Sequence, residues 1–548
     1  MGDNAFSIAT LLIIVPAAGG LVALSMMTRR AAALASLVTF LVQSALLIVG
    51  AVQLSRYADS HASGVAPTCG DALPEQGARF VLAQCTEWFP QWGIEYHVAF
   101  GYAALGLIAL TTLVTASASA FSWWADRPRP AAMQGLLWLT AAALTGLFVS
   151  RDLVLFYVFF ELMLVPLLVL VGTWGGELRI RATMSMFIYT LLGSLPMLVG
   201  VIATGVAANE AFAKAGGDLA DSATFSLPAL SQLVADGGLT LSPWIMLSFI
   251  VAFAIKAPLV PFQGWLPLAY RQAPAEVTAV LSGLISKAAF FGFFVVVLPL
   301  FPGRLDDWPG AVLTWVALFS LVYGSFAAFR QPDMRGVVAY SSLAQMGLIV
   351  LGLMAYLGDG GTQGVSGAYL QSLNHGLVSA AMFLLIGIVE IRTGERTFAK
   401  LGGLGTGRAR LATIGLVLTL VMLAVPGAST FAGELLILSG VFRGDVSGMV
   451  VGTIGAIAVV LAAMYALRLI AGITMTSSAQ VAEDSAPAQE RFGADLGWRE
   501  LLIVVPAIVA LVALSVWPNI ARRSMNEPPV AIQVGADPLV ASAKETDH

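Results

Sequence analysis

Cysteine is nearly absent from this sequence. Only Cys69 and Cys85 occur among 548 residues, and both lie in one polar segment. Iron–sulfur clusters are usually held by cysteine thiolates, and structural zinc sites are commonly rich in cysteine. Two cysteines exclude both kinds of site within this chain, and we expect no cofactor in it.

Charged side chains are also scarce. They make up 11% of the residues, whereas 58% are hydrophobic, and the mean hydropathy is +0.85. This composition is typical of a polytopic membrane protein surrounded by a lipid bilayer. The scattered arginines form no basic cluster, which excludes a nucleic-acid partner. No polar segment is long enough to form a separate soluble domain.

Apolar runs that could cross a bilayer occur along the whole chain. A membrane-spanning helix needs about 17–25 apolar residues, and about fourteen such runs are present. Their centres lie near residues 17, 43, 109, 140, 162, 193, 252, 287, 319, 345, 379, 425, 462 and 509. We therefore expect an all-α fold with three parts. These are two N-terminal helices with an external loop (1–97), a core (98–475), and a cytoplasmic loop with the last helix and a tail (476–548).

The distribution of basic residues predicts the orientation. Arginine and lysine are more frequent in one set of alternate loops, which includes Arg408 and Arg410. Because loops rich in these residues stay in the cytoplasm, we expect both termini to lie outside the cytoplasm. We expect the protein itself in the inner (plasma) membrane of a bacterium. The loop with Cys69 and Cys85 falls on the outer side, where disulfides persist. Either a bridge or two free thiols is compatible with the sequence.

The stretch from Trp244 to Leu300 places two lysines inside apolar runs. Lys256 is followed closely by Pro258, and Lys287 lies in the middle of the next run. An ammonium group at the bilayer centre costs about 2.5–3.5 kcal/mol, and neither lysine is near enough to a span end to reach the headgroups easily. Pro258 also interrupts backbone hydrogen bonding beside Lys256. A helix broken at a charged side chain is a common way to build an ion site in a membrane protein.

A second interrupted run lies between residues 411 and 441. Pro426 and Gly427 break it, and Glu434 follows. It comes five spans after the span that contains Lys256. Interrupted helices at matching positions of two halves indicate an internal repeat, and an odd spacing makes the second copy inverted. We therefore expect two inverted five-helix repeats, with helices 7 and 12 broken.

Ionisable side chains lie deep in five of the expected spans. They are Glu161, Lys256, Lys287, His375 and Glu434. Structural ion pairs that lock helices together are one explanation, but intramembrane ionisable residues commonly mark a proton or substrate path. Five such residues at similar depth favour the path. Arg468, near a span end, either extends to the interface or ends such a path.

Neutral polar side chains accompany these residues at helical spacing. Gln371, His375 and Ser379 share one helix face, and Ser341 and Gln345 share a face of another helix. Such stripes either join helices by hydrogen bonds or line a file of water. The titratable His375 within the stripe favours water.

Several strings of the sequence resemble one known family. They are LFYVFFELMLVPLLVLVGTWGG, FAIKAPLVPFQGWLP, GVVAYSSLAQMGLI, LNHGLVSAAMFLL and FAGELLIL, spread over residues 98–470. Through them the chain is similar to the antiporter-like, proton-translocating subunits of respiratory complex I (NADH-quinone oxidoreductase), and most closely to the M type, chain 4 of mitochondria. The resemblance implies the same inverted repeats and one proton pathway along the membrane midplane.

The resemblance also implies roles in proton transfer. Glu161 matches the family's glutamate of helix 5, and Lys256 matches the lysine of broken helix 7. Lys287, His375 and Glu434 match the lysine of helix 8, the histidine of helix 11 and the terminal acid of broken helix 12. An acid at position 434 favours the M type, because the L and N types usually place a lysine there.

The sequence departs from the family near the expected site of proton uptake from the cytoplasm. The family commonly writes PFHTWLPDAH where this chain has PFQGWLPLAYRQAP, so Gln263, Leu268 and Tyr270 replace a His, an Asp and a His. Gln345 likewise replaces a usual His. These changes affect the uptake route and leave the midplane row intact.

We therefore expect a membrane subunit of a proton-translocating NADH:quinone oxidoreductase. The subunit itself should bind neither NADH nor quinone, and it should lie beside subunits of the L and N types. An alternative is a subunit of a multisubunit cation/proton antiporter, or of a complex I-like hydrogenase or carbon-uptake complex. A purely structural membrane scaffold is an alternative of a different class, which the five buried ionisable residues disfavour.

Overall fold

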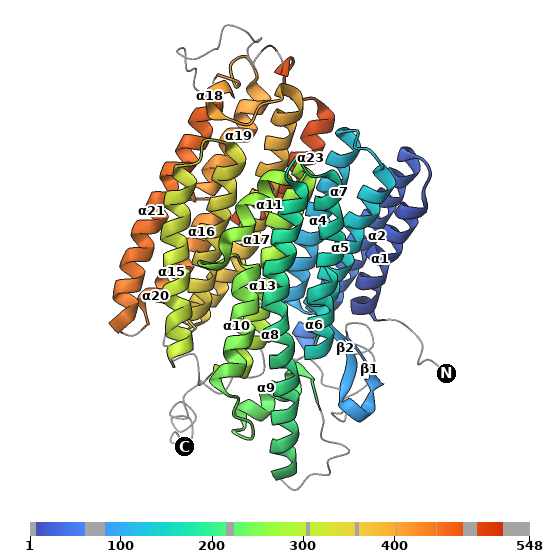
Figure 1. Ribbon diagram of the computed structural model, residues 1–548, viewed down its shortest axis with the longest axis vertical. Helices are drawn as coiled ribbons and strands as arrows, with labels where there is room; N and C mark the ends of the chain where they lie inside the picture. Colours follow the sequence, from blue (N-terminus) through green and yellow to red (C-terminus); the bar gives the residue numbers. More distant parts are fainter. Residues whose placement is uncertain are drawn as a thin grey trace.

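The computed structural model describes residues 7–60, 83–214, 224–302, 307–356, 361–401, 403–444, 446–474, 490 and 492–518. Most of this part consists of helices that run roughly along the long axis of the molecule (Figure 1). The longer helices are α1 (Ile8–Ser25), α2 (Arg29–Ser60), α4 (Tyr102–Trp124), α5 (Pro130–Val149), α6 (Leu153–Leu162), α7 (Leu164–Trp174), α8 (Arg179–Lys214), α10 (Pro243–Lys256), α15 (Trp308–Phe329), α16 (Met334–Met354), α17 (Gly361–Thr393), α19 (Ala409–Met422), α20 (Ser429–Phe442), α21 (Val446–Thr474) and α23 (Trp498–Val516).

Shorter segments connect or interrupt these helices. They are β1 (Ala83–Phe89), η1 (Pro90–Trp92), β2 (Ile94–Ala99), α9 (Leu227–Ala235), η2 (Phe262–Trp265), α11 (Leu266–Gln272), α12 (Ala275–Val280), η3 (Leu281–Ile285), α13 (Ser286–Gly292), η4 (Phe293–Val297), α14 (Leu298–Leu300) and α18 (Phe398–Leu401). Two of them, η3 and η4, are π-helical turns within one continuous span.

The number of spans agrees with the sequence analysis. Twelve helices of the described residues are long and apolar enough to cross a membrane. Two further crossings are interrupted, namely α10 followed by α11, and α19 followed by α20. The breaks therefore fall in helices 7 and 12, as expected. An even number of crossings puts the start of α1 and the end of α23 on the same side of the bundle. The side that faces the cytoplasm and the division of the chain into three parts stay predictions.

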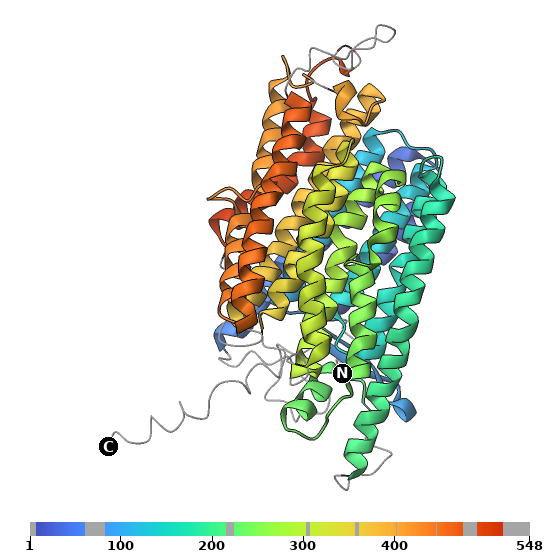
Figure 2. The same ribbon diagram turned by 60° about the vertical axis from the view of Figure 1, so that its left-hand side comes forward.

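Three spans in the middle of the bundle are almost enclosed by the others. In the most apolar 18 residues of the spans Ala275–Leu300, Met334–Met354 and Thr362–Thr393, 94%, 94% and 100% of the residues are buried. In the corresponding 18 residues of the outer span Trp498–Val516 only 28% are buried. In Figure 1 the central helices α13, α16 and α17 lie between α21 on one side and α1 on the other, and Figure 2 shows the same bundle turned by 60°. These central spans carry Lys287, Gln345 and His375.

The break after α10 has a local cause. Pro258 has no N–H to continue the helix, and its ring clashes with the preceding turn. The carbonyl oxygen of Ile255, next to the break, accepts a hydrogen bond from Nε1 of Trp265 at 3.0 Å. Lys256 is the last residue of α10, where the partial negative charge of the helix C-terminus favours a cation. The break lies where Pro258 predicts it.

The segment after the break is held by a buried ion pair. Nε and Nη2 of Arg335 donate to the two carboxylate oxygens of Glu390 at 2.7 and 2.6 Å. Nη1 of Arg335 also donates to the carbonyl oxygens of Tyr270 and Ala273 at 3.2 and 2.6 Å. Arg335 on α16 therefore joins the end of α11 to Glu390 on α17.

A small β-hairpin precedes α4, and we did not predict it. β1 and β2 pair antiparallel, with Cys85 opposite His97. The alternation of Glu95, Tyr96, His97 and Val98 in β2 is a strand signal within a segment that we took as a loop. Cys85 is disulfide-bonded. Cys69, the only other cysteine in the sequence, lies outside the described residues.

Candidate functional site

Glu161 and Lys256 lie next to each other. Nζ of Lys256 is 4.0 Å from Oε1 of Glu161 and donates a hydrogen bond to the carbonyl oxygen of Phe160 at 3.1 Å. The same Nζ lies 3.7 Å from the centroid of the Phe160 ring, a cation–π contact. The side chain of Lys256 is 2% exposed, whereas that of Glu161 is 30% exposed. The ammonium group is therefore enclosed, and the carboxylate is open on one side.

The position of Glu161 depends on an interruption that we did not predict. Met163 separates α6 from α7, and Pro166 in the first turn of α7 provides no N–H for the turn before it. Backbone carbonyls near Glu161 are freed by such an interruption. Lys256 uses the carbonyl of Phe160, and this explains how an ammonium group is satisfied at this depth.

Lys287 and His375 are in direct contact. Nζ of Lys287 lies 2.8 Å from Nδ1 of His375, and it also donates to Ser286 Oγ at 3.1 Å and to the Ser282 carbonyl at 3.0 Å. Lys287 is completely buried. It follows the π-helical turn η3, a kind of turn that is frequent at functional sites. A charged lysine can only donate, so Nδ1 of His375 accepts and the ring proton is assigned to Nε2.

Glu434 is hydrogen-bonded to Gln345, which is in turn bonded to Gln371. Oε1 of Glu434 accepts a hydrogen bond from Nε2 of Gln345 at 3.2 Å, and Oε1 of Gln345 accepts one from Nε2 of Gln371 at 2.8 Å. Glu434 is 5% exposed and lies on α20, in the second half of the broken helix. The sequence showed the two glutamines in separate polar stripes, but not that they bond to each other or that Gln345 binds Glu434.

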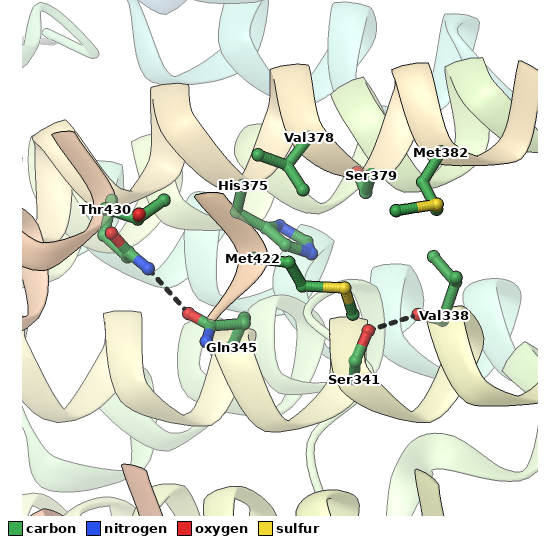
Figure 3. A pocket seen from close by; sticks show the side chains of 10 residues that line it. Val338, Ser341, Gln345, His375, Val378, Ser379, Met382, Met422 and Thr430 are labelled. Atoms are coloured by element: carbon green, nitrogen blue, oxygen red, sulfur yellow. Dashed lines mark hydrogen bonds between the residues drawn. The ribbon is translucent and has the colours of Figure 1, made fainter. Parts of the chain in front are cut away.

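A cavity connects the two polar stripes. It is lined by residues of α16, α17, α19 and α20, which are Val338, Ser341, Gln345, Gln371, His375, Val378, Ser379, Met382, Met422 and Thr430. Figure 3 shows His375 and Ser379 on one helix facing Ser341 and Gln345 on another, with Met422 between them. The cavity offers about 20 Å³ to the centres of water molecules. One water needs about 10–15 Å³ by this measure, so the cavity has room for a water molecule.

The five ionisable residues therefore form three groups. Glu161 pairs with Lys256, Lys287 contacts His375, and Glu434 contacts Gln345. In the described part of the chain, no hydrogen bond or ion pair joins Lys256 to Lys287, or His375 to Glu434. The cavity beside His375 is also lined by Gln345, the hydrogen-bond partner of Glu434.

Of the residues that depart from the family pattern, Gln345 joins the row through Glu434, whereas Gln263, Leu268 and Tyr270 lie near the break after α10. Oε1 of Gln263 is buried without a hydrogen-bond partner. Tyr270 is buried, and its ring packs edge-on against Trp265 and Phe383. Leu268 is half-buried.

Arg468 lies between two aromatic rings. Its guanidinium carbon is 5.6 Å from the centroid of Phe329 and 5.5 Å from that of Phe398. Cation–π contacts of this kind account for a half-buried guanidinium without a proton path.

A second cluster of ionisable residues lies outside the spans. Burial is the largest cause that raises the pKa of Asp152 from 3.8 to about 6, and the pKa of Glu95 is raised by burial and by the nearby Asp152. The potential ligand atoms of Cys85, Glu95 and His97 lie within 4.8 Å of one another. A cysteine binds a metal ion as the thiolate, and Cys85 is disulfide-bonded. This cluster therefore does not fit a metal ion.

Comparisons with known proteins agree with this arrangement. Residues 150–465 match the family model described as NADH:quinone oxidoreductase/Mrp antiporter, TM. NADH-quinone oxidoreductase subunit M of Rhodobacter capsulatus is 33% identical over 433 residues, which cover 78% of this chain and 80% of that protein. The protein of the same name from Rickettsia prowazekii is 30% identical over 432 residues, 79% of this chain and 82% of the relative.

Solved structures extend the similarity to almost the whole chain. A chain of respiratory complex I from Thermus thermophilus superposes with a TM-score of 0.76 at 28% identity, covering 96% of this chain and 98% of that one. A chain of the Mrp complex from Dietzia superposes with a TM-score of 0.73 at 20% identity, covering 98% of both. The second likeness shows the fold alone. The chain belongs to the NADH:quinone oxidoreductase/Mrp antiporter family of transmembrane proteins.

Proposed function

We propose that this chain is the proton-translocating M-type (chain 4) membrane subunit of an NADH:quinone oxidoreductase. The observation that carries the proposal is the 33% identity to subunit M of Rhodobacter capsulatus, over most of both chains. The three buried groups around Lys256, Lys287 and Glu434 support it, because a structural scaffold has no need of them.

In this proposal the five ionisable residues pass protons along the membrane midplane. Glu161 holds Lys256 in its charged form, and Lys287 with His375 forms the middle station. Glu434 is the output end, beside the interruption between α19 and α20. Freed backbone groups at such an interruption can bind water, which gives the last proton a way out.

The redox chemistry belongs to other subunits, and this chain takes part in the reaction only as their proton-translocating partner. We propose subunits of the L and N types as its neighbours, and both termini outside the cytoplasm. No cofactor is proposed for the chain. The enclosed central spans and the lipid-compatible outer helices suit a subunit embedded between others in the inner membrane of a bacterium.

The proposal is tested in the intact complex. Cells that lack the chain are complemented with the wild type or with Glu161→Gln, and the level of complex is checked on a native gel. NADH-driven, quinone-dependent proton uptake is then measured in inverted membrane vesicles. We expect the wild type to restore uptake and the variant to restore only assembly. Normal NADH-driven uptake without the chain, together with loss of cation/proton exchange, would establish the antiporter alternative instead.

A further inference from the structure

Two buried polar atoms border the cavity between α16 and α17 without a hydrogen-bond partner. They are Nε2 of His375 and Oε1 of Gln371. His375 is 5% exposed and Gln371 1%. Buried polar groups are normally satisfied, and a water in such a cavity needs polar partners of this kind. The cavity has the polarity and the room for a water that accepts a hydrogen bond from His375 and donates one to Gln371.

The two hydrogen bonds that connect Gln371 to Glu434 are both donated towards Glu434. An ionised Glu434 can only accept, so the NH2 group of Gln345 faces it. The carbonyl oxygen of Gln345 then faces Gln371, whose NH2 group donates to it. The carbonyl oxygen of Gln371 is left for the cavity. The charge of Glu434 thus fixes the orientation of both amides.

We propose that Gln371 and Gln345 form a reversible hydrogen-bond chain that reports the charge of Glu434 to a water site beside His375. The inference rests on the proposed function and adds two positioning residues to it. When Glu434 is protonated it donates to Gln345, and both amides turn over. Gln371 then presents NH2 instead of the carbonyl oxygen, and the water can no longer bridge His375 to an acceptor. The next proton stays on His375 until Glu434 has released its own.

The surroundings allow this reversal. A Cβ at Gly433 would lie 2.5 Å from Oε1 of Gln371, so the glycine leaves the space in which that amide turns. Thr430 donates its hydroxyl proton to the carbonyl of Val421 at 2.6 Å and does not compete for Gln371. Among the described residues, Tyr465, fully buried on α21, is another titratable side chain close to Glu434 and to Gln345. The amides themselves neither gain nor lose a proton when they turn.

The test uses variants of the assembled complex. Gln345→Met and Gln371→Met keep the side-chain length and remove the amide, whereas Gly433→Ala keeps both amides and blocks their turning. Gln43→Met is the matched control, because Gln43 is also a buried glutamine and donates to the carbonyl of Leu12, in α1, at 3.0 Å. Quinone-dependent proton uptake is measured for each variant. Infrared difference spectra are recorded between pH values at which Glu434 is ionised and protonated.

We expect wild-type spectra to show side-chain amide bands that change together with the Glu434 carboxyl band. These amide bands should be absent from Gln371→Met and from Glu434→Gln, and present in Gln43→Met. Proton uptake should fall about tenfold in Gln345→Met, which loses a hydrogen bond to a charged group. It should fall similarly in Gln371→Met, which breaks the same hydrogen-bond chain. The proposal is overturned if Gln345→Met and Gln371→Met take up protons as fast as Gln43→Met while Glu434→Gln remains blocked. If Glu434→Gln pumps normally, the role of Glu434 in the proposed function fails instead.

Discussion

Nζ of Lys287 lies 2.8 Å from Nδ1 of His375 in the most enclosed part of the bundle. The two residues should respond differently to substitution. Lys287→Met removes a costly buried ammonium group, so the complex should assemble with unchanged stability and pump at least about tenfold more slowly. His375→Leu leaves the ammonium group short of an acceptor and should lower the unfolding temperature as well. Thermal unfolding of the purified complex separates the two variants, and equal losses of stability would contradict this asymmetry.

Glu161 should stabilise the charge of Lys256 without fixing the fold. At 4.0 Å and an effective dielectric constant of about 20, their attraction is about 4 kcal/mol before solvent at the open side of Glu161 weakens it. Glu161→Gln should therefore slow proton uptake about 10- to 100-fold, and Glu161→Asp should keep part of the activity. The assay is proton uptake in inverted vesicles at matched levels of complex. A Gln variant with wild-type stoichiometry would remove Glu161 from the path.

Glu434 should tolerate a change of charge sign better than a loss of charge. Glu434→Gln keeps a hydrogen bond to Gln345 but cannot hold a proton, so pumping should be blocked with assembly intact. Glu434→Lys restores a titratable group, and the amide of Gln345 can turn to accept from it. We expect the Lys variant to pump faster than the Gln variant. The same vesicle assay, with a native gel for assembly, checks the order of the two rates.

Asp152 should make the stability of the protein depend on pH. Its pKa is raised from 3.8 to about 6, mainly by burial, so the folded state is penalised when the group is ionised. The penalty is about 3 kcal/mol above pH 6 and disappears as the pH falls towards 4. Oδ1 of Asp152 also accepts hydrogen bonds from the amides of Val154 and Leu155, both at 2.9 Å, and an asparagine can keep these.

Asp152→Asn should therefore raise the unfolding temperature at pH 8 and leave it almost unchanged at pH 4. Asp152→Ala, which also loses the helix cap, should be less stable than the Asn variant at both pH values by about 1 kcal/mol. Thermal unfolding at the two pH values measures both effects. A constant difference between wild type and Asp152→Asn would mean that Asp152 does not titrate in this range.

The Arg335–Glu390 pair should show strong coupling. Their side chains are 4% and 10% exposed, so either charge alone is poorly solvated. Glu390→Leu should cost about 3–5 kcal/mol, because it leaves Arg335 buried without a charged partner. Arg335→Met should cost less for the lost charge, because Nε of Arg396 still lies 3.6 Å from Oε1 of Glu390. The double variant should lose less than the sum of the two, although the carbonyls of Tyr270 and Ala273 still lose their donor. A double-mutant cycle on the unfolding free energy tests this, and additive losses would show that the pair is not coupled.

Much of this architecture could be predicted from the sequence, for identifiable reasons. Long apolar runs report spans directly, and Pro258 and Pro426 mark breaks because proline acts on its own helix. The buried residues Lys256 and Lys287 stand out because charge is rare in such runs. These signals are local in the chain, and the structure agrees with them.

Other features depend on partners that are distant in sequence. Gln345 and Glu434 are 89 residues apart, and Arg335 and Glu390 are 55 residues apart, so no spacing rule connects them. The β-hairpin carried a weak alternation that a surrounding polar segment obscured. The interruption at Met163 has its proline one turn later, inside a run that is apolar throughout.

The π-helical turn η3 determines the azimuth of Lys287. Each residue of an α-helix advances the side-chain direction by about 100°, and a π turn holds one residue more than an α turn. The direction of Lys287 is therefore set by the number of residues in the turn and not by their identity. Removing one residue, such as Gly283, would rotate Lys287 about 100° away from His375 relative to α12, with every side chain of the row still present. In this span, a change in the number of residues therefore changes the direction of the Lys287 side chain.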